Sequence, residues 1–127
     1  MIKIAIVDDN LFLQKTVQEK LSFFEDIEIK SKSLNGKELL QKLEKNSNLD
    51  LILMDIEMPE MNGVETTAEV KKRYPHIKIL MLTVFDNDEK IFKSIKAGAD
   101  GYLLKEINPQ ELYNSIKETL SGGAAMT

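Results

Sequence analysis

Acidic, hydroxyl and amino side chains follow four separate apolar segments of this 127-residue chain. Asp8 and Asp9 come after the first segment, Asp55 after the third, Thr83 after the fourth and Lys105 after the fifth. If these segments are parallel strands of one open sheet, their carboxyl ends lie along one edge, where ligands bind in α/β proteins. We therefore expect three carboxylates, one hydroxyl and one ammonium group to converge at that edge.

Such a group of side chains fits phosphoryl transfer. Three neighbouring carboxylates repel one another unless a cation binds between them or one of them keeps a proton. Ligand sets made only of oxygen favour Mg²⁺, which retains positions for water and phosphate oxygens. An aspartate can attack phosphorus and form an aspartyl phosphate, while an ammonium group and a hydroxyl can donate to the phosphoryl oxygens. Nucleophile, metal, cation and hydroxyl donor are then all present.

The apolar segments that must position these residues alternate with helical patterns. Three segments lack polar alternation, which is typical of strands buried on both faces. Leu13, Val17 and Leu21 recur at helical spacing after the first segment, and four similar stripes follow the others. The predicted strands are Ile2–Val7, Ile27–Ile29 (weak, and expected at a sheet edge), Leu51–Met54, Ile77–Leu82 and Tyr102–Leu104.

Helix start and stop signals separate the repeated units. Asn35 and Asn62 each precede a glutamate by three residues, and Asn108 is followed by a proline at the first helical position. Pro75 ends the third predicted helix and Gly98 the fourth. Five β-α units predict an α/β fold: a five-stranded parallel sheet in the flavodoxin-like order 2-1-3-4-5, with helices on both faces.

Length and composition set the broad class. The length suits one domain, and the absence of cysteine excludes disulfides. A net charge of −4 without a basic run argues against direct binding of nucleic acid. We find no signal peptide or membrane-spanning stretch and expect a cytoplasmic protein with no membrane partner. We expect one domain over residues 1–121 and the start of a linker over residues 122–127.

The motifs and their order resemble the receiver domains of two-component response regulators, and the resemblance covers essentially the whole chain. The fold expected above is the fold that this family has. The matching motifs are Ile6-Val7-Asp8-Asp9, Leu53-Met54-Asp55-Ile56-Glu57-Met58-Pro59, Asn62-Gly63, Leu82-Thr83 and Lys96-Ala97-Gly98-Ala99-Asp100-Gly101-Tyr102-Leu103-Leu104-Lys105.

The resemblance implies a role for each residue at the strand ends. Asp55 corresponds to the phosphoacceptor of the family, and Asp9 to a direct Mg²⁺ ligand supported by Asp8. The backbone carbonyl of Glu57 corresponds to a further metal ligand. The remaining positions correspond to two groups that bind the phosphoryl oxygens, Thr83 and Lys105, and to an aromatic switch, Tyr102, whose ring turns inward when the threonine moves toward the phosphoryl group.

The resemblance also implies a function. Such a domain is a signalling switch, regulatory and not an enzyme, although it catalyses its own phosphorylation and dephosphorylation. Its partner is a sensor histidine kinase, and a phosphorylation-dependent homodimer is expected. Many receivers have proline after the lysine, whereas this chain has Glu106. With the closing Gly122-Gly123, this form resembles receivers joined to a LuxR-like helix-turn-helix domain, so that DNA would be bound only through an output domain outside this chain.

Three other interpretations stay open at this point. A complete single-domain receiver would act by binding a partner protein. A phosphatase of the haloacid-dehalogenase type needs Asp-x-Asp after the first strand, where this chain has Asp8-Asp9. A flavodoxin needs a phosphate-binding loop rich in serine, threonine and glycine at the same place, and two carboxylates there would repel a phosphate unless a metal intervened.

Overall fold

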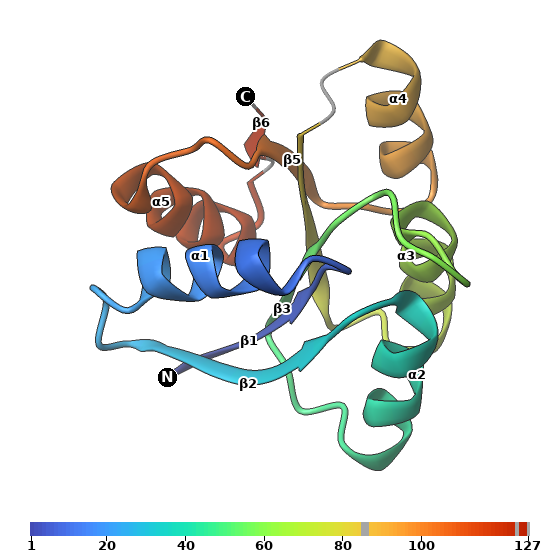
Figure 1. The fold of residues 1–127 in the computed structure, drawn as a ribbon, viewed down its shortest axis with the longest axis horizontal. Helices are drawn as coiled ribbons and strands as arrows, with labels where there is room; N and C mark the ends of the chain where they lie inside the picture. Colours follow the sequence, from blue (N-terminus) through green and yellow to red (C-terminus); the bar gives the residue numbers. More distant parts are fainter. Residues whose placement is uncertain (85–86, 124, 127) are drawn as a thin grey trace.

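The structure, a computed structural model, describes residues 1–84, 87–123 and 125–126, in which strands and helices alternate along the chain (Figure 1). No helix in these residues is long and apolar enough to cross a membrane. The elements are β1 (Ile2–Val7), α1 (Leu11–Leu21), β2 (Ile27–Ser33), α2 (Gly36–Lys45), β3 (Leu51–Met54), α3 (Gly63–Arg73), β4 (Lys78–Thr83), α4 (Asp88–Lys96), β5 (Gly101–Leu104), α5 (Pro109–Leu120) and β6 (Ala125–Met126).

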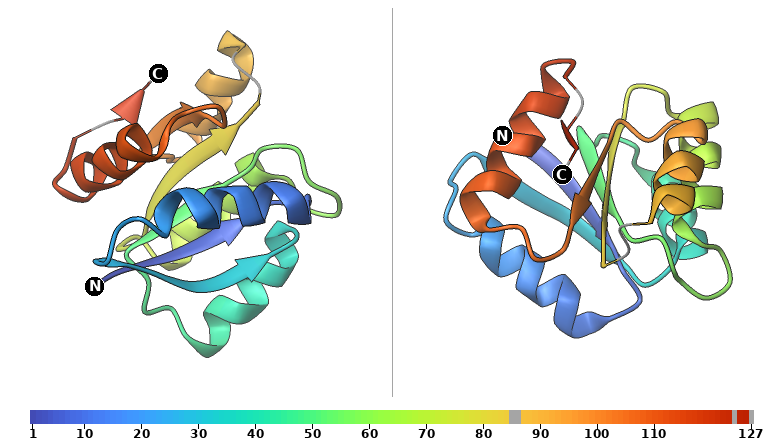
Figure 2. Two further views of the ribbon diagram at one scale, coloured as in Figure 1. Left: turned by 60° about the vertical axis from the view of Figure 1, so that its left-hand side comes forward. Right: turned by 90° about the horizontal axis from the view of Figure 1, so that it is seen from above.

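All neighbouring strands pair in parallel, in the order β2-β1-β3-β4-β5-β6. The predicted order 2-1-3-4-5 is therefore confirmed, with helices on both faces of the sheet (Figure 2). The structure adds one short strand that the sequence did not predict. Ala125 and Met126 pair with Gly101 and Tyr102 as β6, so part of the segment expected to begin a linker extends the sheet.

Strand β2 is longer than predicted. The sequence indicated a strand only over Ile27–Ile29, whereas the strand continues to Ser33 and pairs with β1 beyond a register shift between Ile4 and Ala5. Its second half alternates polar residues of which only Ser33 is buried. Because β2 is the predicted edge strand, main-chain hydrogen bonds to β1 on one side are enough to hold these polar residues in the sheet.

Two apolar layers cover the two faces of the sheet. Alternate residues of the central strands point to opposite faces, so Ile4 and Ile6 pack on α1 and α5, whereas Ala5 and Val7 face the side of α2 and α3. Figure 2 shows the two helix layers on either side of the sheet. Burial on both faces explains why the predicted strands lack polar alternation.

Each of the five helices in the described part of the chain begins after an asparagine whose side chain accepts a hydrogen bond from the backbone N–H three residues later. The sequence indicated three of these caps, Asn35, Asn62 and Asn108. The structure adds Asn10 before α1 and Asn87 before α4. A cap of this kind contributes about 1 kcal/mol, and it fixes where the loop at the strand end stops and the helix begins.

Candidate functional site

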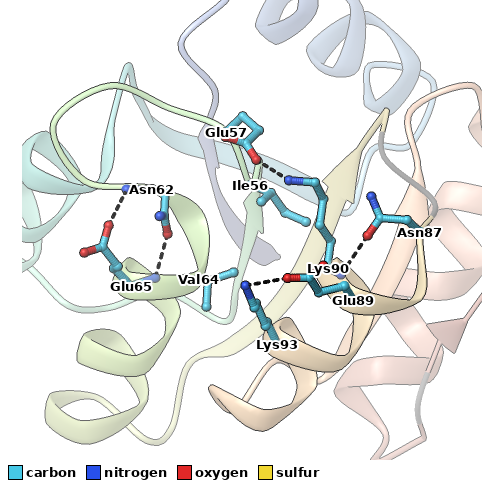
Figure 3. A pocket seen from close by; sticks show the side chains of 9 residues that line it. All are labelled: Ile56, Glu57, Asn62, Val64, Glu65, Asn87, Glu89, Lys90 and Lys93. Carbon is cyan, nitrogen blue, oxygen red and sulfur yellow. Dashed lines mark hydrogen bonds and ion pairs between the residues drawn. The ribbon is translucent and has the colours of Figure 1, made fainter.

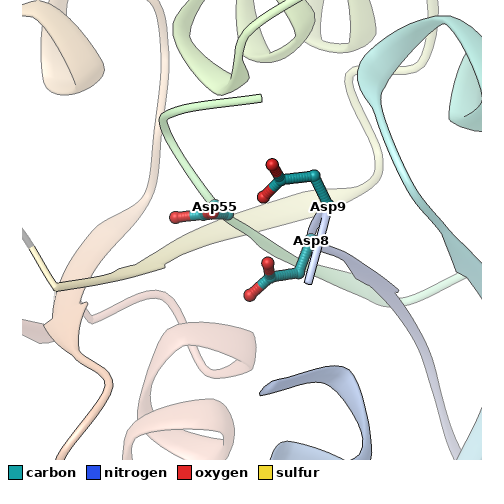
Figure 4. Close-up of side chains that lie close together, drawn as sticks. All are labelled: Asp8, Asp9 and Asp55. Atoms are coloured by element: carbon teal, nitrogen blue, oxygen red, sulfur yellow. The ribbon is translucent and has the colours of Figure 1, made fainter. Parts of the chain in front are cut away.

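The carboxyl ends of β1 and β3 bring the three aspartates together. Val7 pairs with Met54, and the Asp55 N–H donates to the Val7 carbonyl at 2.9 Å. The residues that follow these two strands are therefore neighbours. Asp8, Asp9 and Asp55 each offer a carboxylate oxygen, and the three oxygens lie within 4.8 Å of one another (Figure 4). The predicted convergence of the three carboxylates is therefore confirmed.

Lys105 reaches the same place from the end of β5. Its Nζ lies 2.5 Å from Asp8 Oδ2 and 3.4 Å from Asp55 Oδ2. All three side chains are nearly buried, with exposed fractions of 8% for Lys105 and 5% and 8% for Asp8 and Asp55. The Lys105 N–H donates to the carbonyl of Thr83 at 2.9 Å, which aligns the ends of β4 and β5. One ammonium group therefore faces two of the three carboxylates, those of Asp8 and Asp55.

Burial shapes the acidity of Asp55. Loss of hydration disfavours the charged carboxylate and raises its pKa from 3.8 to about 6. Lys105 opposes this rise as a neighbouring cation, while the nearby charge of Asp8 adds to it. Asp55 Oδ1 also accepts a hydrogen bond from the Ile56 N–H at 2.9 Å. A carboxylate that is costly to ionise in this position has much to gain from an additional cation.

We expect the Asp55→Asn variant to be more stable than the natural protein at about pH 7.5 in metal-free buffer, but not at about pH 4. The unfolded chain releases the Asp55 proton near 3.8 and the folded chain near 6, so the natural protein loses stability as pH rises through this window. Asparagine does not titrate and avoids that loss. The shift corresponds to at most about 3 kcal/mol, and solvent screening reduces it to about 1 to 2 kcal/mol.

Chemical denaturation of both proteins at the two pH values, with a chelator present, measures this difference. The stability gained by the substitution must grow with pH between the two conditions. A gain that is the same at both pH values would show that Asp55 does not titrate in this window.

Three further residues were named from the sequence. Thr83 is the last residue of β4 and is fully buried, and Tyr102 is fully buried in β5 on the α2–α3 side of the sheet. Glu57 lies in the loop after β3, and its exposed carboxylate forms an ion pair with Lys90 of α4 (Figure 3). The side chain of Glu57 is thus engaged with α4.

The loop after β3, the start of α3 and α4 line an open cavity of about 240 Å³ (Figure 3). The ion pair between Lys90 and Glu57 spans this cavity, and Val64 and Ile56 form part of its wall. It adjoins the loop that carries Asp55 but contains none of the three clustered aspartates. The cavity therefore borders the candidate site and is not part of its ligand set.

The start of α3 packs directly against the Asp55 main chain. The Gly63 N–H donates to the Ile56 carbonyl at 2.7 Å. A Cβ atom at position 63 would lie 1.9 Å from the Asp55 carbonyl oxygen, a distance that no side chain can tolerate. Position 63 therefore requires glycine for the close approach, and this packing holds the peptide that carries Asp55 in place.

Two residues at the site were not identified from the sequence. Gln14 of α1 is buried and donates from Nε2 to the carbonyls of Asp8 and Ser33, both at 2.8 Å. Lys20, also on α1, donates to the Lys105 carbonyl at 2.8 Å, and partial burial lowers its pKa. The available signal was that Gln14 precedes Val17 and Leu21 by three and seven residues, which places a polar side chain on the apolar stripe of the helix.

The donor set suits a hard divalent cation. Asp8, Asp9 and Asp55 offer only oxygen atoms, and the Lys105 ammonium group, which contacts two of these carboxylates, supplies one positive charge against three negative ones. Mg²⁺ prefers such oxygen ligands and is usually held by few carboxylates. The chemistry of these residues therefore fits the metal that the sequence predicted.

Comparison with known proteins places the chain in a family. The family model described as the response regulator receiver domain matches residues 4–117. The chain belongs to the response regulator receiver family. The receiver fold and the strand-end carboxylates therefore occur together here, and the phosphatase and flavodoxin interpretations are set aside.

Relatives of this receiver domain include longer regulators. The transcriptional regulatory protein DegU of Brevibacillus brevis is 37% identical over 123 residues, which are 97% of this chain and 52% of DegU. The response regulator protein VraR of Staphylococcus aureus is 37% identical over 121 residues, which are 95% of this chain and 57% of VraR. The receiver domain thus spans about half the length of these relatives.

Solved structures agree with the receiver fold. A CheY-like receiver domain protein from Methanospirillum hungatei is 34% identical with a TM-score of 0.83, over 95% of this chain and 94% of that one. A DNA-binding response regulator of the LuxR family from Staphylococcus aureus is 28% identical with a TM-score of 0.86, over 94% and 99% of the two chains. The predicted similarity to receivers of the LuxR class is confirmed.

Proposed function

We propose that this receiver domain accepts a phosphoryl group on Asp55, in a reaction that requires Mg²⁺, and acts as a signalling switch. One observation carries the proposal: Asp8, Asp9 and Asp55 offer oxygens within 4.8 Å of one another, with the Lys105 ammonium 3.4 Å from the Asp55 carboxylate. Within this family, a buried carboxylate at the end of the central strand, beside a metal-binding pair and a lysine, is placed to be a nucleophile.

In the proposed reaction, a carboxylate oxygen of Asp55 attacks the phosphorus of a phosphorylated donor. The new oxygen–phosphorus bond forms as the bond to the leaving group breaks, and the leaving group keeps that electron pair. For a sensor histidine kinase the leaving group is an imidazole, and for acetyl phosphate it is acetate. Lys105 moves from the carboxylate charge to a phosphoryl oxygen, and the Thr83 hydroxyl donates to another.

Bound Mg²⁺ would neutralise negative charge on the carboxylates and on the transferring phosphoryl group. The proposed ligands are Asp9 and Asp55 directly, Asp8 as support, and the backbone carbonyl of Glu57. Asp8 is already fixed by Lys105 and by the Asn10 N–H, which donates to its Oδ1 at 2.9 Å. Asp9 is exposed and therefore accessible to a cation from solvent.

Mg²⁺ should raise the melting temperature of the natural protein, and the Asp9→Ala substitution should remove most of that rise. A ligand that binds only the folded state at ten times its Kd stabilises by about 1.4 kcal/mol, or roughly 5 °C for a domain of this size. Thermal denaturation with Mg²⁺ or with a chelator measures the effect. The same Mg²⁺ concentration should leave an Asp50→Asn control as responsive as the natural protein, because Asp50 lies at the opposite end of β3.

The metal assignment predicts two results of this experiment. The natural protein must respond to millimolar Mg²⁺, and the Asp9 variant must respond less than the Asp50 control. If all three proteins responded equally, the stabilisation would come from screening of the net charge of −4 and not from a site at Asp9.

The same proposal assigns the switch to Thr83 and Tyr102. Contact with the phosphoryl group draws the Thr83 hydroxyl inward and shifts the Tyr102 ring toward its inward state over an outward one. The ring has the inward state in this structure, where it is fully buried. The change is read out on the face formed by α4, β5 and α5, where Phe92 and Ile95 expose apolar surface, with exposed fractions of 66% and 46%. A phosphorylation-dependent homodimer through this region is part of the proposal.

The proposed output is control of transcription through an attached DNA-binding domain. Its support is the similarity to LuxR-family receivers and the greater length of the relatives. The receiver itself is acidic and unsuited to the phosphate backbone of DNA. The coding sequence beyond Thr127 decides between this output and a single-domain receiver that binds a partner protein: a helix-turn-helix region there supports the first, and a stop codon supports the second.

A further inference from the structure

Gln14 is a buried polar side chain on the helix face that packs against the sheet. Its exposed fraction is 4%, although neighbouring buried positions of the helix, Val17 and Leu21, are apolar. A buried amide is costly unless its hydrogens are donated. Its Nε2 donates to two main-chain carbonyls, those of Asp8 and Ser33. Because both partners can only accept, the nitrogen and not the oxygen of the amide must face them.

These two bonds fix the loop that begins with Asp8. The Asp8 N–H donates to the Ser33 carbonyl at 3.0 Å, and the Asp8 carbonyl accepts from Gln14 at 2.8 Å. Both main-chain groups of Asp8 are therefore held, the N–H by β2 and the carbonyl by α1. The Gln14 backbone N–H also donates to the Asn10 carbonyl at 3.0 Å, which closes the segment onto the first turn of α1.

The direction of the Asp8 carbonyl constrains the main chain of Asp9. The carbonyl of residue 8 and the N–H of residue 9 belong to one planar peptide unit, so a fixed carbonyl direction also fixes the N–Cα bond of Asp9 and leaves the rotation about that bond as the main freedom of its side-chain direction. Asp9 is exposed, in contrast to Asp8 and Asp55. Its orientation toward the other two carboxylates depends on its main chain.

We propose that Gln14 is a positioning residue for the metal-binding loop: its amide holds the Asp8–Asp9 peptide so that the carboxylates converge before a cation binds. The inference rests on the proposed Mg²⁺ site and deepens it. Preorganised ligands do not have to be ordered by the metal, and loss of groups that orient ligands typically weakens metal affinity by about 10- to 100-fold.

The test compares the full 127-residue chain with its Gln14→Met and Ile116→Val variants. Methionine keeps the length and volume of the side chain but removes both donors. Ile116 is fully buried in α5, on the same side of the sheet as α1, so its truncation loosens the core on that side and leaves the Gln14 amide unchanged. The Mg²⁺ dissociation constant is obtained from ¹⁵N-labelled protein by NMR titration, and amide hydrogen exchange is measured in chelator.

We expect the Gln14→Met variant to bind Mg²⁺ about tenfold more weakly than the natural protein, and its Asp9 and Asn10 amides to exchange faster in chelator. The Ile116→Val variant should bind Mg²⁺ like the natural protein. If Gln14→Met does not fold, Gln14→Asn replaces it, because this side chain keeps an amide but withdraws it by one methylene group.

Natural affinity in a folded Gln14 variant would overturn the positioning role and leave the Mg²⁺ site intact. Equal weakening in the Ile116 control would also overturn it, because general loss of stability would then explain the effect. If the natural protein itself bound no Mg²⁺, the proposed metal site would be wrong and the inference would fall with it.

Discussion

The Asp55→Asn variant should take up no phosphoryl group from acetyl phosphate and Mg²⁺, under conditions in which the natural protein does. Asparagine keeps the shape of the side chain but its amide is a far weaker nucleophile than a carboxylate. The main-chain contacts of the residue, such as the N–H that donates to Val7, are unaffected. Intact-protein mass measures the uptake directly, and we expect a complete loss of the adduct.

A matched control lies at the other end of the same strand. Asp50 immediately precedes β3, and its carboxylate accepts from the Lys3 N–H at 2.8 Å. The Asp50→Asn variant should therefore be labelled like the natural protein. Labelling of the Asp55 variant at the natural level would place the acceptor on another residue.

The Lys105→Met substitution should slow phosphorylation by about 10²- to 10³-fold, the typical cost of removing one preorganised group that stabilises developing charge. Lys105 lies 3.4 Å from the Asp55 carboxylate. Its charge also lowers the pKa of Asp55 against the effect of burial. Without Lys105, that pKa rises further, so a smaller fraction of Asp55 is ionised and able to attack near neutral pH.

The rate is measured from the time course of the phosphoryl adduct with acetyl phosphate. Lys78→Met is the control, because Lys78 is also paired with an aspartate, Asp100, at 3.9 Å. Lys78 lies at the start of β4, whereas the site lies at the carboxyl ends of the strands. It should react at the natural rate. A Lys105 variant that is folded and equally fast would mean that this ammonium group does not contact the phosphoryl group.

Much of this molecule can be predicted from the sequence because strand ends fix both fold and site. Runs such as Leu51–Met54 lack polar residues, and the structure buries them on both faces of the sheet. Once the strands are parallel, the residue after each strand must lie at one edge. Asp8, Asp55 and Lys105 converge for this reason, although no local feature of the sequence states that they touch.

The features that the sequence did not predict depend on tertiary contacts. The polar half of β2, up to Ser33, resembles a loop until its main chain pairs with β1. Strand β6 is too short to have a periodicity of its own. Gln14 lies on the apolar stripe of α1, but only the docking of α1 on the sheet shows that the side chains of Gln14 and Lys20 reach the carbonyls of Asp8 and Lys105.

Chemical mapping of the phosphoryl group on the natural protein tests the central claim most directly. The chain is incubated with acetyl phosphate in Mg²⁺ or in chelator, the acyl phosphate is reduced with borohydride, and peptides are sequenced by mass spectrometry. Reduction converts a phosphorylated aspartate to homoserine. We predict homoserine at position 55 in Mg²⁺ and none in chelator. Homoserine at position 8 or 9 instead, or equal amounts at position 55 with and without Mg²⁺, would contradict the account.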